Sequence, residues 1–299
     1  MRIISIIILL VAILGTVFTE MYLRYVGLGD PIRYDSDYIY GYAPKINQKK
    51  QRINGSVVTI NDIGLRTKTN WKNDKRNKIV FFGDSITYGG SYIDDDETFV
   101  SLVCQKLEKF LCGNAGVNAY GVINIINRSK FDQRLNDSDI VIFVLAPGDF
   151  YREYANSNTA HFYLNKKKFK LPAIFEAISF IATKYDLNNK ISKLDDSTKL
   201  HKKELINFSV EYLKNEIEKL KKNKKKVIIF YTIEKNDPSS LKSINKFILE
   251  LINKKNIDFI NLNTILNKKE YFYDNVHYSQ KGHEIVSKEI IKTVVSILN

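Results

Sequence analysis

One short stretch limits the fold of this chain more than any other: an apolar run that ends in a Gly-Asp-Ser turn. Ile79–Phe82 holds four consecutive apolar residues, rich in β formers and without polar alternation. Such a run predicts a strand that is buried on both faces, as in a parallel sheet. The turn that follows places Ser85 at the carboxyl end of this strand, where open α/β sheets build their sites. The same Ser is equally compatible with an ordinary helix cap.

Strand-like and helix-like segments alternate from this stretch to the end of the chain. Alternation of this kind implies right-handed crossovers and a mostly parallel sheet with helices on both faces. We therefore predict a three-layer α/β/α fold of the flavodoxin-like type. The expected strands are 79–82, a short strand before 114, 140–145, 227–233 and 258–262; the expected helices are 97–110, one ending near 134, 199–223, 238–254 and 282–298.

The chain begins with an apolar run that is long enough to interact with a membrane. Apolar residues continue almost without interruption from Ile3 to Phe18. This length suits either a signal peptide or a helix that just spans a bilayer. No pattern of small residues predicts a cleavage site. The run also lacks a polar face, which argues against a buried core helix. We predict an uncleaved, single-pass transmembrane anchor over residues 1–20, with a cleaved signal peptide as the alternative.

Basic residues on either side of this run bear on its orientation. Arg2 favours an N-inside anchor, while Arg24 and Arg33 follow the run closely and oppose that orientation. An N-inside anchor leaves the remaining domain outside the cytoplasm, on the periplasmic side.

The rest of the chain divides into two parts by composition. Residues 21–75 form a Tyr-rich lead-in, in which Val57–Arg66 predicts a short strand and a turn. Residues 76–299 are predicted to form one domain. Within it, about 150–199 is irregular, and we predict an insertion that covers the edge of the sheet, in the position of a lid.

The chain is strongly basic, with a formal net charge of +13. The excess is mostly Lys, accompanied by much Asn and Ile, so one interpretation is a general bias in composition. Anionic lipid or an acidic glycan would also be attracted. The charges are dispersed and do not form basic stripes interleaved with aromatic residues, so we predict no nucleic-acid partner. Cys104 and Cys112 allow no disulfide framework, no Cys/His cluster has metal-ligand spacing, and we predict neither a metal nor another cofactor.

A motif near the end of the chain supplies the groups that Ser85 needs in order to react. Asp274 and His277 lie three residues apart, between the last expected strand and the last expected helix. At this spacing the carboxylate can bind Nδ1 of the imidazole, which leaves Nε2 to accept the proton of Ser85. His283 is expected on the helix face, and His161, in the insertion, stays open as a substrate contact.

Taken together, these motifs resemble the GDSL/SGNH hydrolase family, over about residues 78–298. The resemblance rests on four blocks: Gly83-Asp84-Ser85, Gly116 in Asn-x-Gly-x-x-x-x-Gly, Pro147-Gly148-Asp149 and Asp274-x-x-His277. It implies that Ser85 is the nucleophile, His277 the general base and then acid, and Asp274 the orienting carboxylate. It further implies that the N–H groups of Ser85 and Gly116 hold the oxyanion.

The third block departs from the family's pattern. Members present an Asn in a Gly-x-Asn-Asp pattern, and Gly148 stands in the place of that Asn. An oxyanion donor of this kind is worth about two to three powers of ten in rate. Either the N–H of Gly148 donates, or Asn118 or Arg152 substitutes as a substrate-binding donor, or activity is low. Asp149 cannot replace the amide, because a carboxylate only accepts hydrogen bonds.

The leading hypothesis is a membrane-anchored serine esterase that acts through an acyl-enzyme. Its substrate would be an ester, such as an O-acyl group on a cell-envelope glycan or a lipid, by fold-level analogy. One alternative is an O-acyltransferase that uses the same three residues. Another is a glycan-binding or assembly protein with impaired catalysis.

Overall fold

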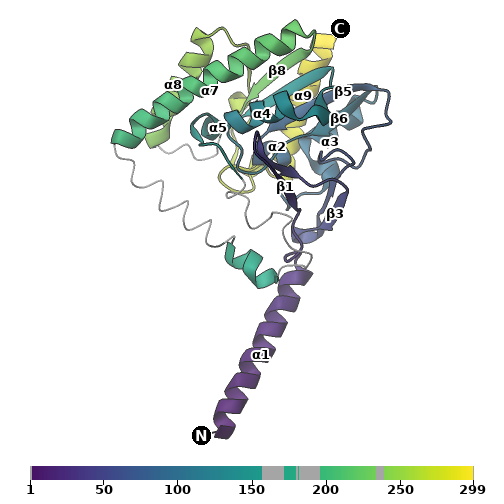
Figure 1. Ribbon diagram of the computed structural model, residues 1–299, viewed down its shortest axis with the longest axis vertical. Helices are drawn as coiled ribbons and strands as arrows, with labels where there is room; N and C mark the ends of the chain where they lie inside the picture. Colours follow the sequence, from purple (N-terminus) through teal and green to yellow (C-terminus); the bar gives the residue numbers. More distant parts are fainter. Residues whose placement is uncertain (1, 157–171, 180, 182–195, 234–238, 299) are drawn as a thin grey trace.

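The computed structural model describes residues 2–156, 172–179, 181, 196–233 and 239–298. A long helix, α1 (Arg2–Tyr25), projects from an α/β domain, and the two chain ends lie at opposite ends of the molecule (Figure 1). The segment Ile3–Tyr25 is long and apolar enough to cross a membrane, and none of its most apolar window is buried in the protein. A signal sequence has the same properties, so α1 by itself defines an apolar segment and not a topology.

A five-stranded parallel sheet forms the centre of the domain. Its strands are β5 (Asn77–Gly83), β6 (Phe110–Asn114), β7 (Ile140–Leu145), β8 (Lys226–Tyr231) and β9 (Ile260–Asn261). They are ordered β6-β5-β7-β8-β9, and every neighbouring pair is parallel. In chain order this is the flavodoxin-like arrangement 2-1-3-4-5, which confirms the predicted fold class. The strand that leads to Ser85, β5, is buried from Lys78 onward.

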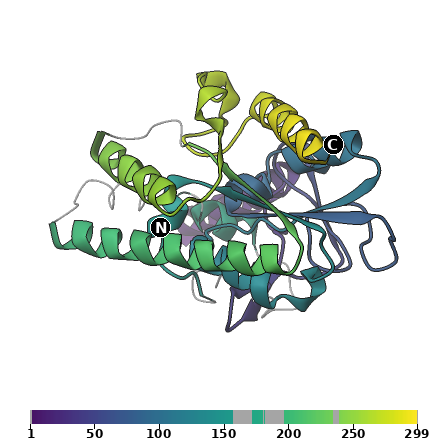
Figure 2. The same ribbon diagram turned by 90° about the horizontal axis from the view of Figure 1, so that it is seen from above.

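Helices cover both faces of this sheet, and alternate residues of β5 pack against the helices on opposite faces. Val80 and Phe82 belong to a core shared with the helices α4 (Val122–Phe131), α7 (Asp196–Lys222) and α8 (Ser239–Lys254). Ile79 and Phe81 belong to a second core, shared with α3 (Phe99–Lys106) and α9 (Gln280–Leu298). Figure 2 shows α7 and α9 on opposite sides of the sheet. The predicted three layers are therefore present.

The lead-in packs into the first of these cores. It forms two antiparallel pairs, β1 (Tyr34–Asp37) with β2 (Gly41–Pro44) and β3 (Gln48–Gln51) with β4 (Val57–Ile60). Tyr42, Val58 and Trp71 are fully buried members of the core that contains Val80 and Phe82. Arg66 extends this connection, because its backbone N–H donates to the backbone carbonyl oxygen of Asn114 in β6 at 2.9 Å.

The predicted insertion lies only partly within the described residues; 157–171, 182–195 and His161 fall outside them. Its beginning runs along α4, where Asn124 exchanges two hydrogen bonds with the backbone of Ala155. A short helix over 173–179 lies beside the domain end of α1 (Figure 1).

Candidate active site

The turn after β5 fixes the position of Ser85. A Cβ atom on Gly83 would collide with the side chain of Thr87 and the carbonyl oxygen of Val144, so only glycine fits there. Asp84 caps the short helix α2 (Ser85–Tyr88), because its carboxylate accepts a hydrogen bond from the N–H of Ile86 at 2.8 Å. As the first residue of α2, Ser85 keeps an N–H that has no partner inside the helix.

Three side chains from distant parts of the sequence form a continuous hydrogen-bonded chain at this turn. Oγ of Ser85 lies 2.9 Å from Nε2 of His277, and Nδ1 of His277 lies 2.7 Å from Oδ2 of Asp274. The other oxygen, Oδ1 of Asp274, accepts the N–H groups of Val276 and His277, both at 2.8 Å. With Nδ1 bound to a carboxylate, Nε2 is the nitrogen that is able to take the hydroxyl proton of Ser85.

The electrostatics of these three hydrogen-bonded side chains make the imidazole of His277 more basic. Burial lowers the pKa of His277, but the hydrogen bond and charge of Asp274 raise it more, so the net pKa lies above its ordinary value. Burial raises the pKa of Asp274, while its bonds to His277 lower it to about 2. The side chains of His277 and Asp274 are 28% and 47% exposed, so water reaches both groups.

Two tyrosines, which the sequence reasoning missed, support the loop that carries His277. The ring of Tyr92 stacks on Tyr273 with 3.8 Å between centroids and 5° between planes. The hydroxyl of Tyr92 donates to the carbonyl oxygen of Tyr278 at 2.8 Å. Both contacts join the loop after α2 to the loop before α9. No spacing in the sequence marks this pair, since Tyr is frequent throughout the chain.

The structure argues against the oxyanion role that was expected for Gly116. Its N–H already donates to Oδ1 of Asn114 at 2.9 Å inside the protein. A Cβ atom on Gly116 would collide with the backbone N of Tyr88, so the residue has to be glycine for α2 to pack closely. Gly116 therefore supports the turn that holds Ser85, and its N–H does not face the site.

The loop that follows Gly116 is also joined to the turn before Ser85. The N–H of Val117 donates to the carbonyl oxygen of Gly83 at 3.1 Å, which ties this loop to the turn before Ser85. Asn118 is exposed, and Tyr42 donates its hydroxyl to the Asn118 carbonyl oxygen at 2.7 Å. Ala119 has a φ of +65° and is half-buried, and no residue of the described part accepts its N–H.

The third block forms a short helix, α5 (Pro147–Tyr151), beside the same turn. Gly148 is buried in its first turn. Asp149 is fully buried and accepts the N–H of Ala146 at 2.9 Å. Burial and the neighbouring carboxylate of Asp84 raise the pKa of Asp149, against the effect of Arg152.

Arg152 connects the turn before α2, the helix α5 and the loop that follows Gly116. Its Nη1 lies 3.1 Å from Oδ1 of Asp149 and 3.4 Å from Oδ2 of Asp84, and it donates to the carbonyl oxygen of Tyr120. The side chain is 35% exposed, while both carboxylates are buried. A guanidinium group is therefore held beside the turn of Ser85, and part of its surface is exposed to solvent.

The other titratable candidates lie away from this chemistry. His283 is buried, and its Nδ1 accepts the N–H of Phe99 at 3.1 Å. Burial lowers the pKa of His283 to about 3, so it is neutral and part of the core. Cys104 and Cys112 are free thiols. Within the described ranges, no group of three or more His, Cys, Asp or Glu residues is placed to hold a metal ion.

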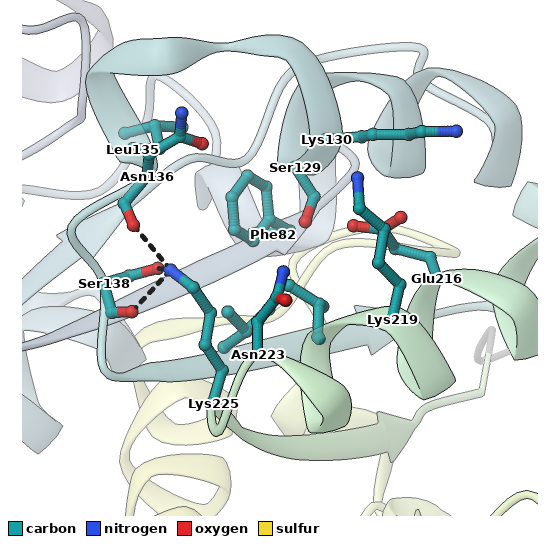
Figure 3. Close-up of a pocket in the computed structure, with 12 residues that line it drawn as sticks. Phe82, Ser129, Lys130, Leu135, Asn136, Ser138, Glu216, Lys219, Asn223 and Lys225 are labelled. Atoms are coloured by element: carbon teal, nitrogen blue, oxygen red, sulfur yellow. Dashed lines mark hydrogen bonds between the residues drawn. The ribbon is translucent and has the colours of Figure 1, made fainter.

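A surface pocket between α4 and α7 does not belong to this site (Figure 3). It is lined by residues that include Ser129, Glu216 and Lys225. Nζ of Lys225 donates to the carbonyl oxygens of Asn136 and Ser138 at 2.6 and 2.7 Å. Since Lys225 precedes β8 and Ser138 precedes β7, the pocket lies at the amino ends of the strands, opposite the edge that carries Ser85.

Comparison with known proteins gives structural matches only. No family model matches the sequence, and no curated protein matches it. A lipase/acylhydrolase from Enterococcus faecalis is 18% identical, with 73% of this chain and 95% of that chain covered at a TM-score of 0.45. A lipolytic protein of the G-D-S-L family from Veillonella parvula is 16% identical, with coverages of 72% and 96% and a TM-score of 0.41. A catalytic mutant of an acetylxylan esterase from Geobacillus stearothermophilus is 16% identical, with coverages of 74% and 95% and a TM-score of 0.45. At these identities and TM-scores the matches do not bear on the activity of this chain.

Proposed function

We propose that this protein is a serine ester hydrolase in which Ser85 forms an acyl-enzyme. The observation that supports it most strongly is the hydrogen-bonded chain from Ser85 through His277 to Asp274, at 2.9 and 2.7 Å. Oγ of Ser85 attacks the ester carbonyl while Nε2 of His277 takes its proton. The imidazolium then gives that proton to the departing alkoxide. Water, deprotonated by the same nitrogen, attacks the acyl-enzyme and releases the acid and free Ser85.

The oxyanion formed in these steps needs donors, and the site offers three. The N–H of Ser85 has no partner inside α2, and the N–H of Ala119 has none in the described residues. We assign these two groups to the oxyanion in place of the Ser85 and Gly116 pair that the resemblance implied. Arg152 takes the role of the missing Asn, because its side chain is partly exposed at the turn whereas Gly148 is buried.

The setting of this activity is a membrane surface. The exposed, apolar α1 acts as an uncleaved single-pass anchor with the domain on the extracytoplasmic side. The substrate is an ester carried by an envelope glycan or a lipid, which a domain tethered to a membrane meets at high local concentration.

The geometry favours hydrolysis over the two alternatives. The complete series of hydrogen bonds from Ser85 through His277 to Asp274 argues against a binding protein that has lost catalytic activity. The exposure of His277 and Asp274 leaves the acyl-enzyme open to water, whereas a transferase has to exclude water from this position.

The direct test is hydrolysis of 4-nitrophenyl acetate by the full chain in detergent. Replacement of Ser85 or His277 by Ala is expected to lower kcat/KM by at least about a thousandfold, since each variant removes a group that acts in every step. The matched controls are Ser101→Ala in α3 and His201→Ala, an exposed residue of α7. An unchanged rate in Ser85→Ala or His277→Ala, with normal circular dichroism, would show that the assignment is wrong.

A further inference from the structure

The short helix over 173–179 is fastened to the last turns of α1. The carboxylate of Glu20 accepts the N–H groups of Ala173 and Ile174 at 2.9 and 3.1 Å. Glu20 thus caps the start of one helix from within another, and Arg24 binds the same carboxylate at 2.7 Å. Figure 1 shows the short helix beside the domain end of α1.

A buried ion pair fastens the opposite face of this helix to the domain. Glu176 and Arg52 form a salt bridge in which both side chains are almost fully buried. The second carboxylate oxygen of Glu176 accepts the N–H of Gly29 at 2.5 Å, and Nη1 of Arg52 donates to the carbonyl oxygen of Gly27 at 2.8 Å. Because a buried charge is costly without its partner, this network holds the helix in one orientation.

That orientation turns an apolar face outward. Phe175, Ile178 and Ile181 are 56%, 55% and 57% exposed, although they are large and hydrophobic. Their spacing of three residues places them along one side of a helix, and Ala173 and Glu176 on the other side are buried. Exposed apolar faces of this kind mark contacts with a protein, a ligand or a membrane.

The position of Glu20 along α1 indicates which of these three kinds of contact the apolar face makes. Glu20 lies about 26 Å along the helix axis from Ile3, while the hydrocarbon layer of a bilayer is about 30 Å thick. Tyr22 and Tyr25, which follow Glu20, are strongly exposed, as expected of tyrosines at the level of the lipid headgroups. The helix attached to Glu20 therefore begins at the boundary between lipid chains and headgroups.

We propose that the helix over 173–179, together with Ile181, is a second membrane contact, which inserts Phe175, Ile178 and Ile181 into the lipid leaflet from which α1 emerges. This inference rests on the anchor in the proposed function. Its occupant is lipid because the apolar face belongs to a helix that begins beside Glu20, next to the end of the apolar part of α1. A single spanning helix lets a domain rotate and tilt, and a second contact fixes which side of the domain faces the membrane.

The test uses the full chain in lipid vesicles and the fluorescence of tryptophan. Phe175→Trp places a reporter on the outward face, and Trp71, which is buried in the domain, supplies a constant background. Phe131→Trp is the matched control, since Phe131 is also an exposed phenylalanine and lies in α4. Vesicles are made either with ordinary phosphatidylcholine or with a phosphatidylcholine brominated near the headgroup end of its acyl chains, which quenches only tryptophans in contact with lipid.

We expect brominated lipid to reduce the added emission of Phe175→Trp about twofold and to leave Phe131→Trp and the unsubstituted chain unchanged. Equal emission of Phe175→Trp in both lipids, from protein that floats with the vesicles, overturns the second contact and leaves the anchor intact. Protein that does not float overturns the anchor and the second contact together. Ester hydrolysis by the same preparations reports on Ser85 and His277 independently of either result.

Discussion

The charge on Asp274 determines how strongly His277 binds a proton. Burial alone would lower the pKa of His277, and the carboxylate reverses that effect, so the pKa lies above the ordinary 6.5. As the proposed base, His277 can act only when neutral. The proposed activity should therefore be lost as the pH falls through this raised pKa and be fully present above it.

This balance predicts a specific change in the pH profile. The acid limb of kcat/KM in the unsubstituted protein should have its midpoint above 6.5. Asp274→Asn removes the charge and leaves burial, so the midpoint should move down, with a rate loss of about a hundredfold to ten-thousandfold. Profiles of 4-nitrophenyl acetate hydrolysis between pH 5 and about pH 9 measure both effects. A midpoint that is the same in the two proteins contradicts the assignment of Asp274.

Arg152 offers a second test at the residue scale. If its guanidinium stabilises the oxyanion, Arg152→Met should lower kcat about a hundredfold with little change in KM, because the interaction forms only in the transition state. Arg152→Lys should recover part of kcat, since it restores the positive charge. Thermal unfolding of both variants controls for the contacts with Asp84 and Asp149. A kcat that is unaffected by Arg152→Met rules out this role.

Spacing in the sequence predicted which side chains meet, but not which N–H groups are free. Asp274 and His277 lie three residues apart, and this local spacing alone is sufficient to predict their hydrogen bond. The N–H of Gly116 is taken up by Asn114, and the positive φ of Ala119 has no signal in the sequence, because a non-glycine residue rarely adopts it.

At the scale of elements, the predicted bounds match the structure closely for some elements and miss it by several residues for others. The strand over 140–145 is found with the predicted bounds as β7. The helix predicted to reach Phe110 ends at Lys106, because β6 begins at Phe110. The helix α5 was not predicted, although Pro at a first helical position is a common start signal.

The buried ion pair predicts how the short helix over 173–179 is held. Arg52→Met leaves the carboxylate of Glu176 buried without its partner, which costs about 3–5 kcal/mol. We expect amide hydrogens of 173–179 to exchange at least tenfold faster by mass spectrometry, while α9 stays protected. Replacing both Arg52 and Glu176 by Met should restore much of the protection.

The control for this prediction is Lys50→Met. Lys50 forms an ion pair with Asp30 that is partly exposed, and pairs of that kind contribute about 1 kcal/mol or less. Lys50→Met should therefore leave amide exchange in 173–179 unchanged. Equal exchange in Arg52→Met and the unsubstituted chain would contradict the account of how this helix is fastened.

At the scale of the whole molecule, the sequence indicated the layers but not how the lead-in joins them. Alternation of strands and helices is a local signal, and it is sufficient to predict a sheet covered on both faces. The packing of Tyr42, Val58 and Trp71 against β5 depends on contacts between distant segments. Such contacts leave no periodic trace, so the residues through which the lead-in packs could be identified only from the structure.

The whole chain also brings Ser85 and His277 together across 192 positions, and the central claim is that this contact makes Ser85 a nucleophile. A fluorophosphonate forms a covalent adduct with an activated serine and is read by peptide mass spectrometry of the intact chain. The account predicts one adduct on the peptide that contains Ser85, lost in Ser85→Ala and at least about a hundredfold slower in His277→Ala. Labelling that is absent, that falls on another serine, or that proceeds equally fast without His277 would contradict it.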